Sequence, residues 1–169
     1  MTPLGRLAAR AMRRYPEPID PDLAPAGRAG RPTWQRPGIL LAVAVGGVIG
    51  ACARYEFSAA MPSRPGAFPT ATFLINVTGS FVLGFLLTAM VERWRPNEYL
   101  RPLIATGVIG AYTTWSTFMT DADNLIKDGH PAMAVGYLAA SLAGGLAAVY
   151  AGTTLARGRL PRLTGKEED

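Results

Sequence analysis

Four long apolar segments, separated by short polar stretches, limit this chain to a membrane-spanning helical architecture. The segments cover approximately residues 38–60, 70–91, 103–126 and 132–155. Each is long enough to cross the hydrocarbon core of a bilayer as a helix, which takes about 20 residues. Hydrocarbon offers no hydrogen-bond partner to backbone groups, so segments of this kind cross as helices. The sequence therefore predicts an all-α integral membrane protein with four transmembrane helices.

Charged residues lie mostly outside these segments and divide the chain into three regions. The chain has 169 residues, is 49% hydrophobic and carries a formal net charge of +5. Residues 1–37 are basic and rich in proline, which favours a disordered extension. Residues 38–156 contain the membrane segments, and residues 157–169 form a charged tail. Because the arginines flank membrane segments, we expect contact with membrane lipid and no nucleic-acid partner.

The distribution of lysine and arginine predicts a fixed orientation in the plasma (inner) membrane. If the N-terminus is inside, fourteen of these residues lie on the cytoplasmic side. Only Arg64 and Lys127 lie in loops on the opposite side. Positive residues are retained in cytoplasmic loops, so both termini are predicted to be cytoplasmic.

The third apolar segment contains an unusually polar stretch, GVIGAYTTWSTF at residues 107–118. An unsatisfied polar group costs several kcal/mol at membrane depth, so these hydroxyls need protein or water around them. Gly107 and Gly110 also weaken a helix at this point. Two alternatives are open at this stage: a polar contact between regular helices, or a helix broken near its middle that offers oxygens to an ion.

Polar residues also occur in the first two segments. Asn76 and Ser80 lie four residues apart and therefore share one helical face. An asparagine at this depth needs a partner, either through an interhelical hydrogen bond or as a pore-lining amide. Arg54, in the outer half of the first segment, is expected to face a cavity or to extend to the membrane surface.

Several signatures of catalysis and active transport are missing from the sequence. There is no phosphate-binding loop, no GxSxG motif and no Cys/His cluster with metal-ligand spacing, so an enzyme is not expected. Glu56, Asp121 and Asp123 all lie towards segment ends, whereas a proton-coupled exporter needs a carboxylate within the membrane. A passive pathway is favoured, and a small four-span multidrug or cation exporter of the inverted-dimer type is the alternative.

Three motifs, in order along the chain, resemble those of the Fluc (CrcB) fluoride channels. They are GGVIGACARY (46–55), NVTGSFVLG (76–84) and GAYTTWSTF (110–118). The resemblance covers approximately residues 38–156. It implies a fluoride-specific channel that exports F⁻ passively and reduces cytoplasmic fluoride toxicity. It also implies an inverted (antiparallel) dimer whose third helices break around a central Na⁺ that is structural and not transported.

The resemblance assigns roles to individual residues. Backbone carbonyls of Gly110 and Thr113 match those that hold the sodium ion, and carbonyl oxygens suit a hard monovalent cation. Arg54 matches the arginine of the vestibule. The residues expected along the fluoride path are Asn76, Ser80, Thr114, Trp115, Phe118, Tyr137 and Ser141.

Three features depart from the family pattern. Trp115 replaces a phenylalanine, which adds an N–H donor and a larger ring, and the sequence leaves open whether it faces the pore. Gly145 and Ala147 stand where further hydroxyls are expected, so the polar path is thinner. The strong charge bias conflicts with a homodimer of opposite orientations. We therefore expect either a homodimer or, favoured by this bias, a heterodimer with an oppositely oriented homologous subunit.

Overall fold

The computed structural model of the chain describes residues 36–92 and 98–159, and within these ranges all regular elements are helices. The chain divides into two units, Met1–Pro37 and Gly38–Asp169. The helices described below belong to the second unit. The extension predicted for residues 1–37 and most of the predicted tail lie outside the described residues.

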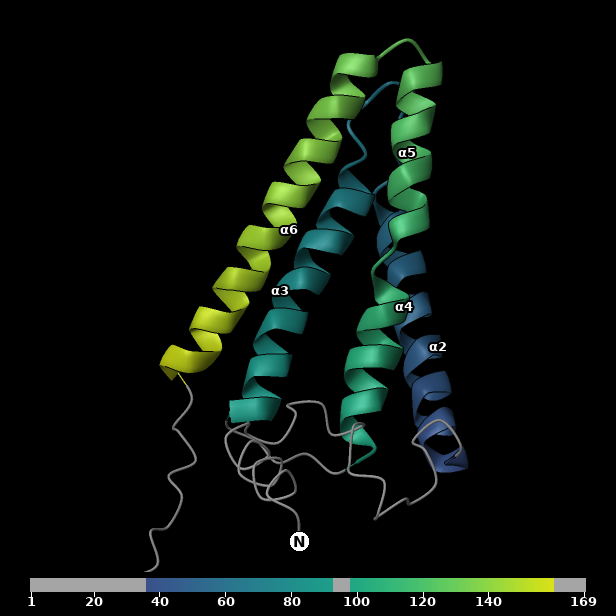
Figure 1. The fold of residues 1–169 in the computed structure, drawn as a ribbon. Coiled ribbons are helices and arrows are strands. Elements are labelled where there is room, and N and C mark those ends of the chain that lie inside the picture. The colour runs from purple at the N-terminus through teal and green to yellow at the C-terminus, as the bar shows by residue number, and fades with distance from the viewer. Residues whose placement is uncertain (1–35, 93–97, 160–169) are drawn as a thin grey trace, which may run out of the picture. The chain divides into compact units, whose positions relative to one another are not determined.

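Three long, uninterrupted helices account for the first, second and fourth apolar segments (Figure 1). They are α2 (Pro37–Ala60), α3 (Thr70–Glu92) and α6 (Pro131–Arg159). Each is long and apolar enough to cross a membrane. α2 and α6 both begin with proline, whose missing N–H costs nothing in the first turn of a helix. The predicted boundaries agree with the observed ones to within a few residues.

The third apolar segment is interrupted, as the broken-helix alternative predicted. It consists of a π-helical piece η3 (Pro102–Ile109), the short α4 (Gly110–Tyr112) and α5 (Trp115–Lys127). Between α4 and α5 the backbone is extended at Thr113 and Thr114, with ψ angles of 156° and 121°. Figure 1 shows this extended link between α4 and α5. No single helix covers this segment, although its pieces follow one another through the bundle.

α3 and α6 run parallel and side by side (Figure 1), and glycines bring their backbones together. A Cβ atom on Gly152 would lie 2.2 Å from the carbonyl oxygen of Phe81. A Cβ atom on Gly84 would lie 2.6 Å from the carbonyl oxygen of Val149. No side chain fits at either contact, which explains the small residues of this helix pair. A Cβ atom on Gly136 of α6 would meet nothing within 4 Å, so this glycine does not take part in the close contact.

α2 packs against the first part of the broken helix in the same way. A Cβ atom on Gly46 would lie 2.1 Å from the Leu103 carbonyl oxygen, and one on Gly50 would lie 2.1 Å from that of Val108. A Cβ atom on Gly47 would meet nothing within 4 Å. Gly46 and Gly50, but not Gly47, therefore form the close contact with η3.

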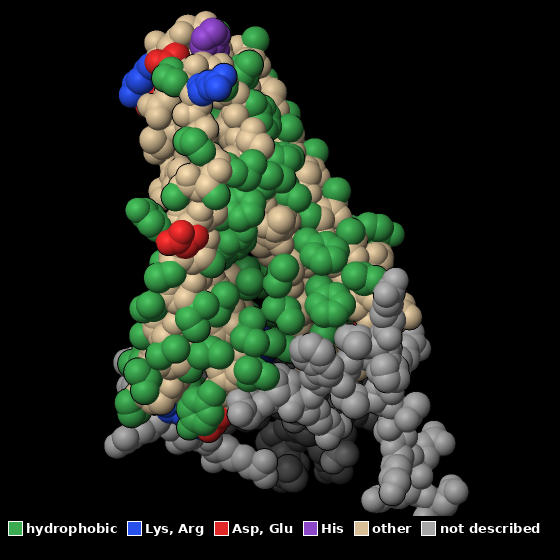
Figure 2. Space-filling view, turned by 180° about the vertical axis from the view of Figure 1, so that it is seen from behind, with side chains coloured by type: hydrophobic (Ala, Val, Ile, Leu, Met, Phe, Trp, Pro, Cys, Tyr) green, Lys and Arg blue, Asp and Glu red, His purple; other side chains and the backbone are tan. Residues whose placement is uncertain are grey.

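The buried core lies between α5 and α6. It consists of Phe118, Ala122, Leu125, Ala134 and Tyr137, with Phe68, Phe73 and Leu138 packed against it. Much of the outer surface is apolar: Figure 2 shows hydrophobic side chains over much of one face, with the histidine and several charged side chains at one end and a few other charged side chains elsewhere. A wide apolar belt of this kind suits a lipid environment.

Candidate ion pathway

Asn76 of α3 hydrogen-bonds to the backbone at the break in the third segment. Its Nδ2 donates to the Thr114 carbonyl oxygen at 3.0 Å, and the Thr114 N–H donates to its Oδ1 at 2.9 Å. The side chain thus pairs the Thr114 N–H, which has lost its helical acceptor, and adds a hydrogen bond to the Thr114 carbonyl. Of the two alternatives for Asn76, the interhelical hydrogen bond is present. One amide hydrogen is left over for a further acceptor.

The break also frees two carbonyl groups. In a continuous helix the Thr114 N–H would bond to the Gly110 carbonyl, but here it bonds to Asn76. The Thr117 N–H would likewise bond to the Thr113 carbonyl, but it donates to Thr114 Oγ1 at 3.1 Å. Side chains therefore take both donors away from the backbone. The two carbonyls that lose their helical partners are the pair expected to hold Na⁺.

The Thr114 side chain caps α5. Its hydroxyl is therefore less available to an ion than its predicted place along the fluoride path suggested. Besides accepting from the Thr117 N–H, Thr114 Oγ1 donates to Thr117 Oγ1 at 3.0 Å and lies 3.3 Å from Ser116 Oγ. The bond from the Thr117 N–H satisfies one orphan donor of the first helical turn. Thr114 is buried, and its hydroxyl caps the start of α5.

The predicted aromatic residues form one row. The ring centroids of Trp115 and Phe118 are 5.3 Å apart, and those of Phe118 and Tyr137 are 5.2 Å apart. Tyr137 also meets Phe68, from the α2–α3 loop, at 5.3 Å. Phe118 and Tyr137 are only 3% and 0% exposed, whereas Trp115 is 67% exposed on the surface of the chain. The structure thus brings the three predicted aromatics together, with Trp115 at the outer end.

Neighbouring residues of α3 and α6 differ by a constant number of positions along the two helices. This offset shows which of the remaining predicted residues lie opposite each other. Glu92 and Arg157, 65 positions apart, form an ion pair of 2.9 Å at one end of the two helices. A Cβ atom on Gly145 would lie 3.6 Å from Ser80 Oγ, and these two residues have the same offset. One turn earlier, the same offset places Ser141 level with Asn76.

Ser141 is the one predicted path residue whose polar atom is both buried and unpaired. Its side chain is 8% exposed, and Oγ has no hydrogen-bond partner among the described residues. A buried hydroxyl without a partner is costly and requires an explanation. Ser80, one turn along, faces the space left by Gly145. The absent hydroxyl at Gly145 therefore leaves room beside Ser80.

A carboxylate inside the bundle was missed by the sequence reasoning. Asp121 Oδ2 accepts a hydrogen bond from Thr72 Oγ1 at 2.6 Å and from the Tyr137 hydroxyl at 3.5 Å. Asp121 of α5 is half-buried and contacts side chains of α3 and α6, whereas the sequence showed only that it lies towards a segment end.

Arg54 lies apart from this group. It is half-buried on α2. Among the described residues it forms no hydrogen bond or ion pair with the other predicted path residues.

Comparison with known proteins identifies the family. Residues 41–153 match the family model described as CrcB-like protein, Camphor Resistance (CrcB). The chain is 45% identical over 127 residues to "Fluoride-specific ion channel FluC 3" of Streptomyces avermitilis, a match that covers 75% of this chain and 62% of that protein. The chain thus spans just under two thirds of the length of this relative.

Two further relatives are similar to the same part of the chain. "Fluoride-specific ion channel FluC 2" of Nocardia farcinica is 42% identical over 121 residues, covering 72% of this chain and 86% of that protein. FluC 2 of Streptomyces avermitilis is 40% identical over 119 residues, covering 70% and 75%. Together with its apolar helices, these matches describe a multi-pass membrane protein. The match of the family model over residues 41–153 contains all three motifs and the break of the third helix, and the chain belongs to the CrcB family.

Proposed function

We propose that this chain is a subunit of a fluoride-specific channel through which F⁻ leaves the cell passively. HF crosses membranes undissociated and releases F⁻ inside, where the charged form is trapped. A channel lets that anion run out down the membrane potential. The names of the similar relatives support a channel over the multidrug or cation exporter.

The buried, unpaired hydroxyl of Ser141 carries this proposal. It lies level with Asn76, beside the first turn of α5. The N-terminus of a helix attracts anions through its free N–H groups and its dipole. A small anion in this layer would accept hydrogen bonds from the Ser141 hydroxyl and from the remaining amide hydrogen of Asn76.

The electropositive edges of the Phe118 and Trp115 rings adjoin the same turn of α5. Ser80 and Tyr137 extend the polar lining one turn in either direction.

Replacing Ser141 by alanine tests the anion path. Because its Oγ makes no hydrogen bond, we expect S141A to change the unfolding free energy by less than about 1 kcal/mol. Fluoride efflux from liposomes, followed with a fluoride electrode, should fall by about tenfold or more, since a hydrogen bond to a charged group contributes about 1.5–3 kcal/mol.

The matched control for S141A is Thr154→Ala. Thr154 lies on the same helix, and among the described residues its exposed hydroxyl bonds only to the Ala151 carbonyl oxygen. T154A should leave fluoride efflux at the wild-type rate. Efflux that is equal in S141A and the wild type, with both proteins folded, would contradict the anion path.

The carbonyls of Gly110 and Thr113 fit a structural sodium ion in an inverted dimer. Their helical donors are taken by Asn76 and Thr114, so each carbonyl has a free lone pair for a hard cation. Gly110 is exposed on the surface of the single subunit, where a second subunit would bring a matching pair of carbonyls. Sodium would neutralise the dipoles that converge at the break. Replacing Na⁺ by N-methylglucamine should lower the unfolding temperature, and an unchanged temperature would count against the site.

The charge distribution of the chain is best explained if the partner subunit is an oppositely oriented homologue. The arginine-rich ends favour one orientation with both termini cytoplasmic, whereas an inverted homodimer needs two. Streptomyces avermitilis contains two of the similar relatives, FluC 2 and FluC 3, so one cell can supply different family members. We expect fluoride efflux per protein to rise when such a homologue is co-expressed with this chain. No change on co-expression would favour the homodimer.

A further inference from the structure

α3 contacts the break in the third segment at more than one point. The Tyr112 hydroxyl of α4 lies 3.1 Å from Thr78 Oγ1 of α3. Thr78 Oγ1 itself donates to a backbone carbonyl oxygen one turn earlier at 2.6 Å, so the Tyr112 hydroxyl is the donor of this bond. Asn76 bonds to Thr114. α3 therefore binds the residues on both sides of Thr113.

Thr113 itself packs against Gly79 of α3. A Cβ atom on Gly79 would lie 2.3 Å from Thr113 Cγ2 and 3.3 Å from Tyr112 Cδ1. Gly79 is buried, so the Thr113 methyl group occupies the place that a side chain at this position would take. The methyl group cannot turn away freely, because Thr113 Oγ1 donates to the Ile109 carbonyl oxygen at 3.0 Å and a β-branched side chain has few rotamers.

The peptide bond between Thr113 and Thr114 has a direction that α3 determines. This bond is trans, as are all those of the described residues, and in a trans peptide the C=O and N–H groups point opposite ways. The Thr114 N–H donates to Asn76 of α3, so the Thr113 carbonyl oxygen points away from α3. How far it extends depends on how closely Thr113 approaches α3 at Gly79.

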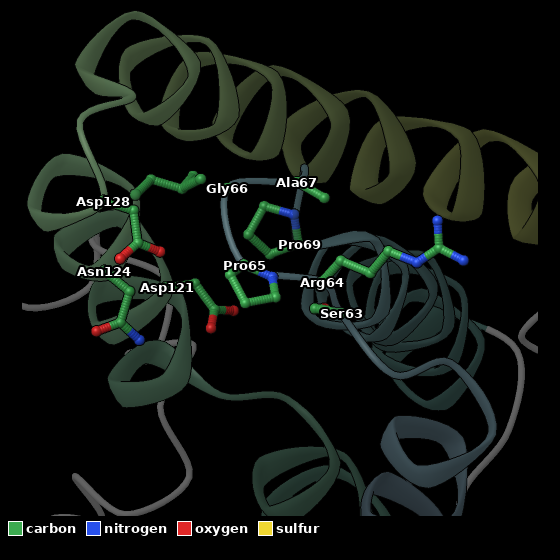
Figure 3. A pocket seen from close by; sticks show the side chains of 10 residues that line it. Ser63, Arg64, Pro65, Gly66, Ala67, Pro69, Asp121, Asn124 and Asp128 are labelled. Carbon is green, nitrogen blue, oxygen red and sulfur yellow. The ribbon is translucent and has the colours of Figure 1, made fainter.

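The end of α5 at Lys127, by contrast, is packed less closely. There α5 and the α2–α3 loop border a cavity of about 280 Å³. Figure 3 shows side chains of the loop on one side of this space and those of α5 and its following turn on the other. The close contacts that locate the break therefore lie at its own level, on α3.

We propose that Gly79 is a positioning residue for the proposed sodium site. Because it has no side chain, Thr113 packs close to α3 and its carbonyl oxygen lies where a cation can bind. An added methyl group would push Thr113 outward by about 1 Å, since carbon atoms pack at about 3.5 Å or more. Site groups must be held within about 0.5 Å of their working geometry. This inference rests on the sodium ion of the proposed function and not on fluoride conduction.

The unfolding temperature, titrated with Na⁺, measures the site without any need for channel activity. The full-length protein is unfolded in detergent while NaCl replaces N-methylglucamine chloride at constant ionic strength. An ion that binds the folded state raises the unfolding temperature as its concentration increases, which gives its dissociation constant. Gly79→Ala should raise the dissociation constant of Na⁺ by about tenfold or more, as loss of a group that orients a metal ligand does.

Gly84→Ala is the matched control, because it also adds a methyl group to α3. Its Cβ atom would lie 2.6 Å from the Val149 carbonyl oxygen of α6, away from the break. G84A should lower the unfolding temperature at every Na⁺ concentration, yet keep the dissociation constant within about twofold of the wild-type value. An equal loss of Na⁺ affinity in G84A and G79A would reflect a general loss of structure and would overturn the inference.

Moving the methyl group from Thr113 to position 79 tests the contact itself. Thr113→Ser removes Cγ2 and keeps the hydroxyl that bonds to Ile109. In the double variant G79A/T113S, the new Cβ atom takes the vacated place, so Na⁺ affinity should return to within about threefold of the wild-type value. The double variant should bind Na⁺ more tightly than either single variant. A double variant no tighter than T113S would overturn the inference, and this comparison holds even if G79A alone does not fold.

Fluoride efflux from liposomes, measured on the same proteins, separates this inference from the channel. The expected order of Na⁺ affinities in a protein that carries no fluoride would refute the channel and still support the role of Gly79. A wild-type unfolding temperature that does not respond to Na⁺ would overturn both the sodium site and the role of Gly79.

Discussion

At the scale of single residues, Asn76 holds the extended backbone between α4 and α5. Its amide meets both the N–H and the C=O of Thr114, at 2.9 and 3.0 Å. The same bonds prevent the Thr114 N–H from closing onto the Gly110 carbonyl. One side chain therefore stabilises the break and exposes an oxygen at its centre.

Asn76→Ala should destabilise the protein by about 1–3 kcal/mol, because it leaves the buried Thr114 N–H unsatisfied. Thermal unfolding in detergent would measure the change. Asn124→Ala is the control, since that asparagine is exposed and its side chain makes no hydrogen bond among the described residues. Equal unfolding temperatures for the two variants would mean that Asn76 does not hold the break.

At the scale of helices, glycine positions decide how closely the elements pack. Gly46 and Gly50 place α2 directly against backbone oxygens of η3. Gly84 and Gly152 do the same between α3 and α6. In lipid, where burial of apolar surface gives little advantage, such close backbone contact is a main source of helix association.

Gly50→Ala should destabilise the protein by about 1–3 kcal/mol or more, because the added methyl group would lie 2.1 Å from a backbone oxygen that cannot move freely. Gly47→Ala, three residues away on the same helix, meets nothing within 4 Å. This control should be neutral or stabilise by up to about 1 kcal/mol through helix propensity. Unfolding temperatures that rank the two variants in the opposite order would refute the α2 contact.

At the scale of the whole molecule, the single chain leaves groups of the proposed ion pathway and sodium site on its surface. Trp115 is 67% exposed, and Gly110 is also exposed. A polar break facing lipid would be costly. A second subunit against this face would remove that cost, which fits the proposed dimer.

The orientation of the subunit is testable with reporters fused to the C-terminus. With fourteen of its lysines and arginines at one end and two at the other, the chain expressed alone should give an almost purely cytoplasmic signal. Fusions to alkaline phosphatase and to a cytoplasmic fluorescent protein report the two sides. Similar signals from both reporters would show dual topology and would remove the reason for a different partner.

Much of the architecture was predictable from the sequence, and the hydrogen-bonding partners were not. The spans, the break near Thr113 and the family follow from local signals such as apolar length and motif order. The contact of Asp121 with Thr72 and Tyr137 does not, because it joins three helices. The π-helical form of η3 was likewise missed, since it differs from an α-helix only in hydrogen-bond register.

The amino-acid sequence by itself determined that this protein is a membrane helix bundle, because a backbone in hydrocarbon must pair within its own segment. It also placed the weak point of the third helix at its glycines and threonines. Only the tertiary structure decided which polar groups remain available. The register of α3 against α6 and the bonds of Asn76 commit Thr114 to the scaffold and leave the hydroxyl of Ser141 unpaired. Which polar groups are hydrogen-bonded depends on which helices pack together and in what register. Short-range sequence patterns do not specify that packing.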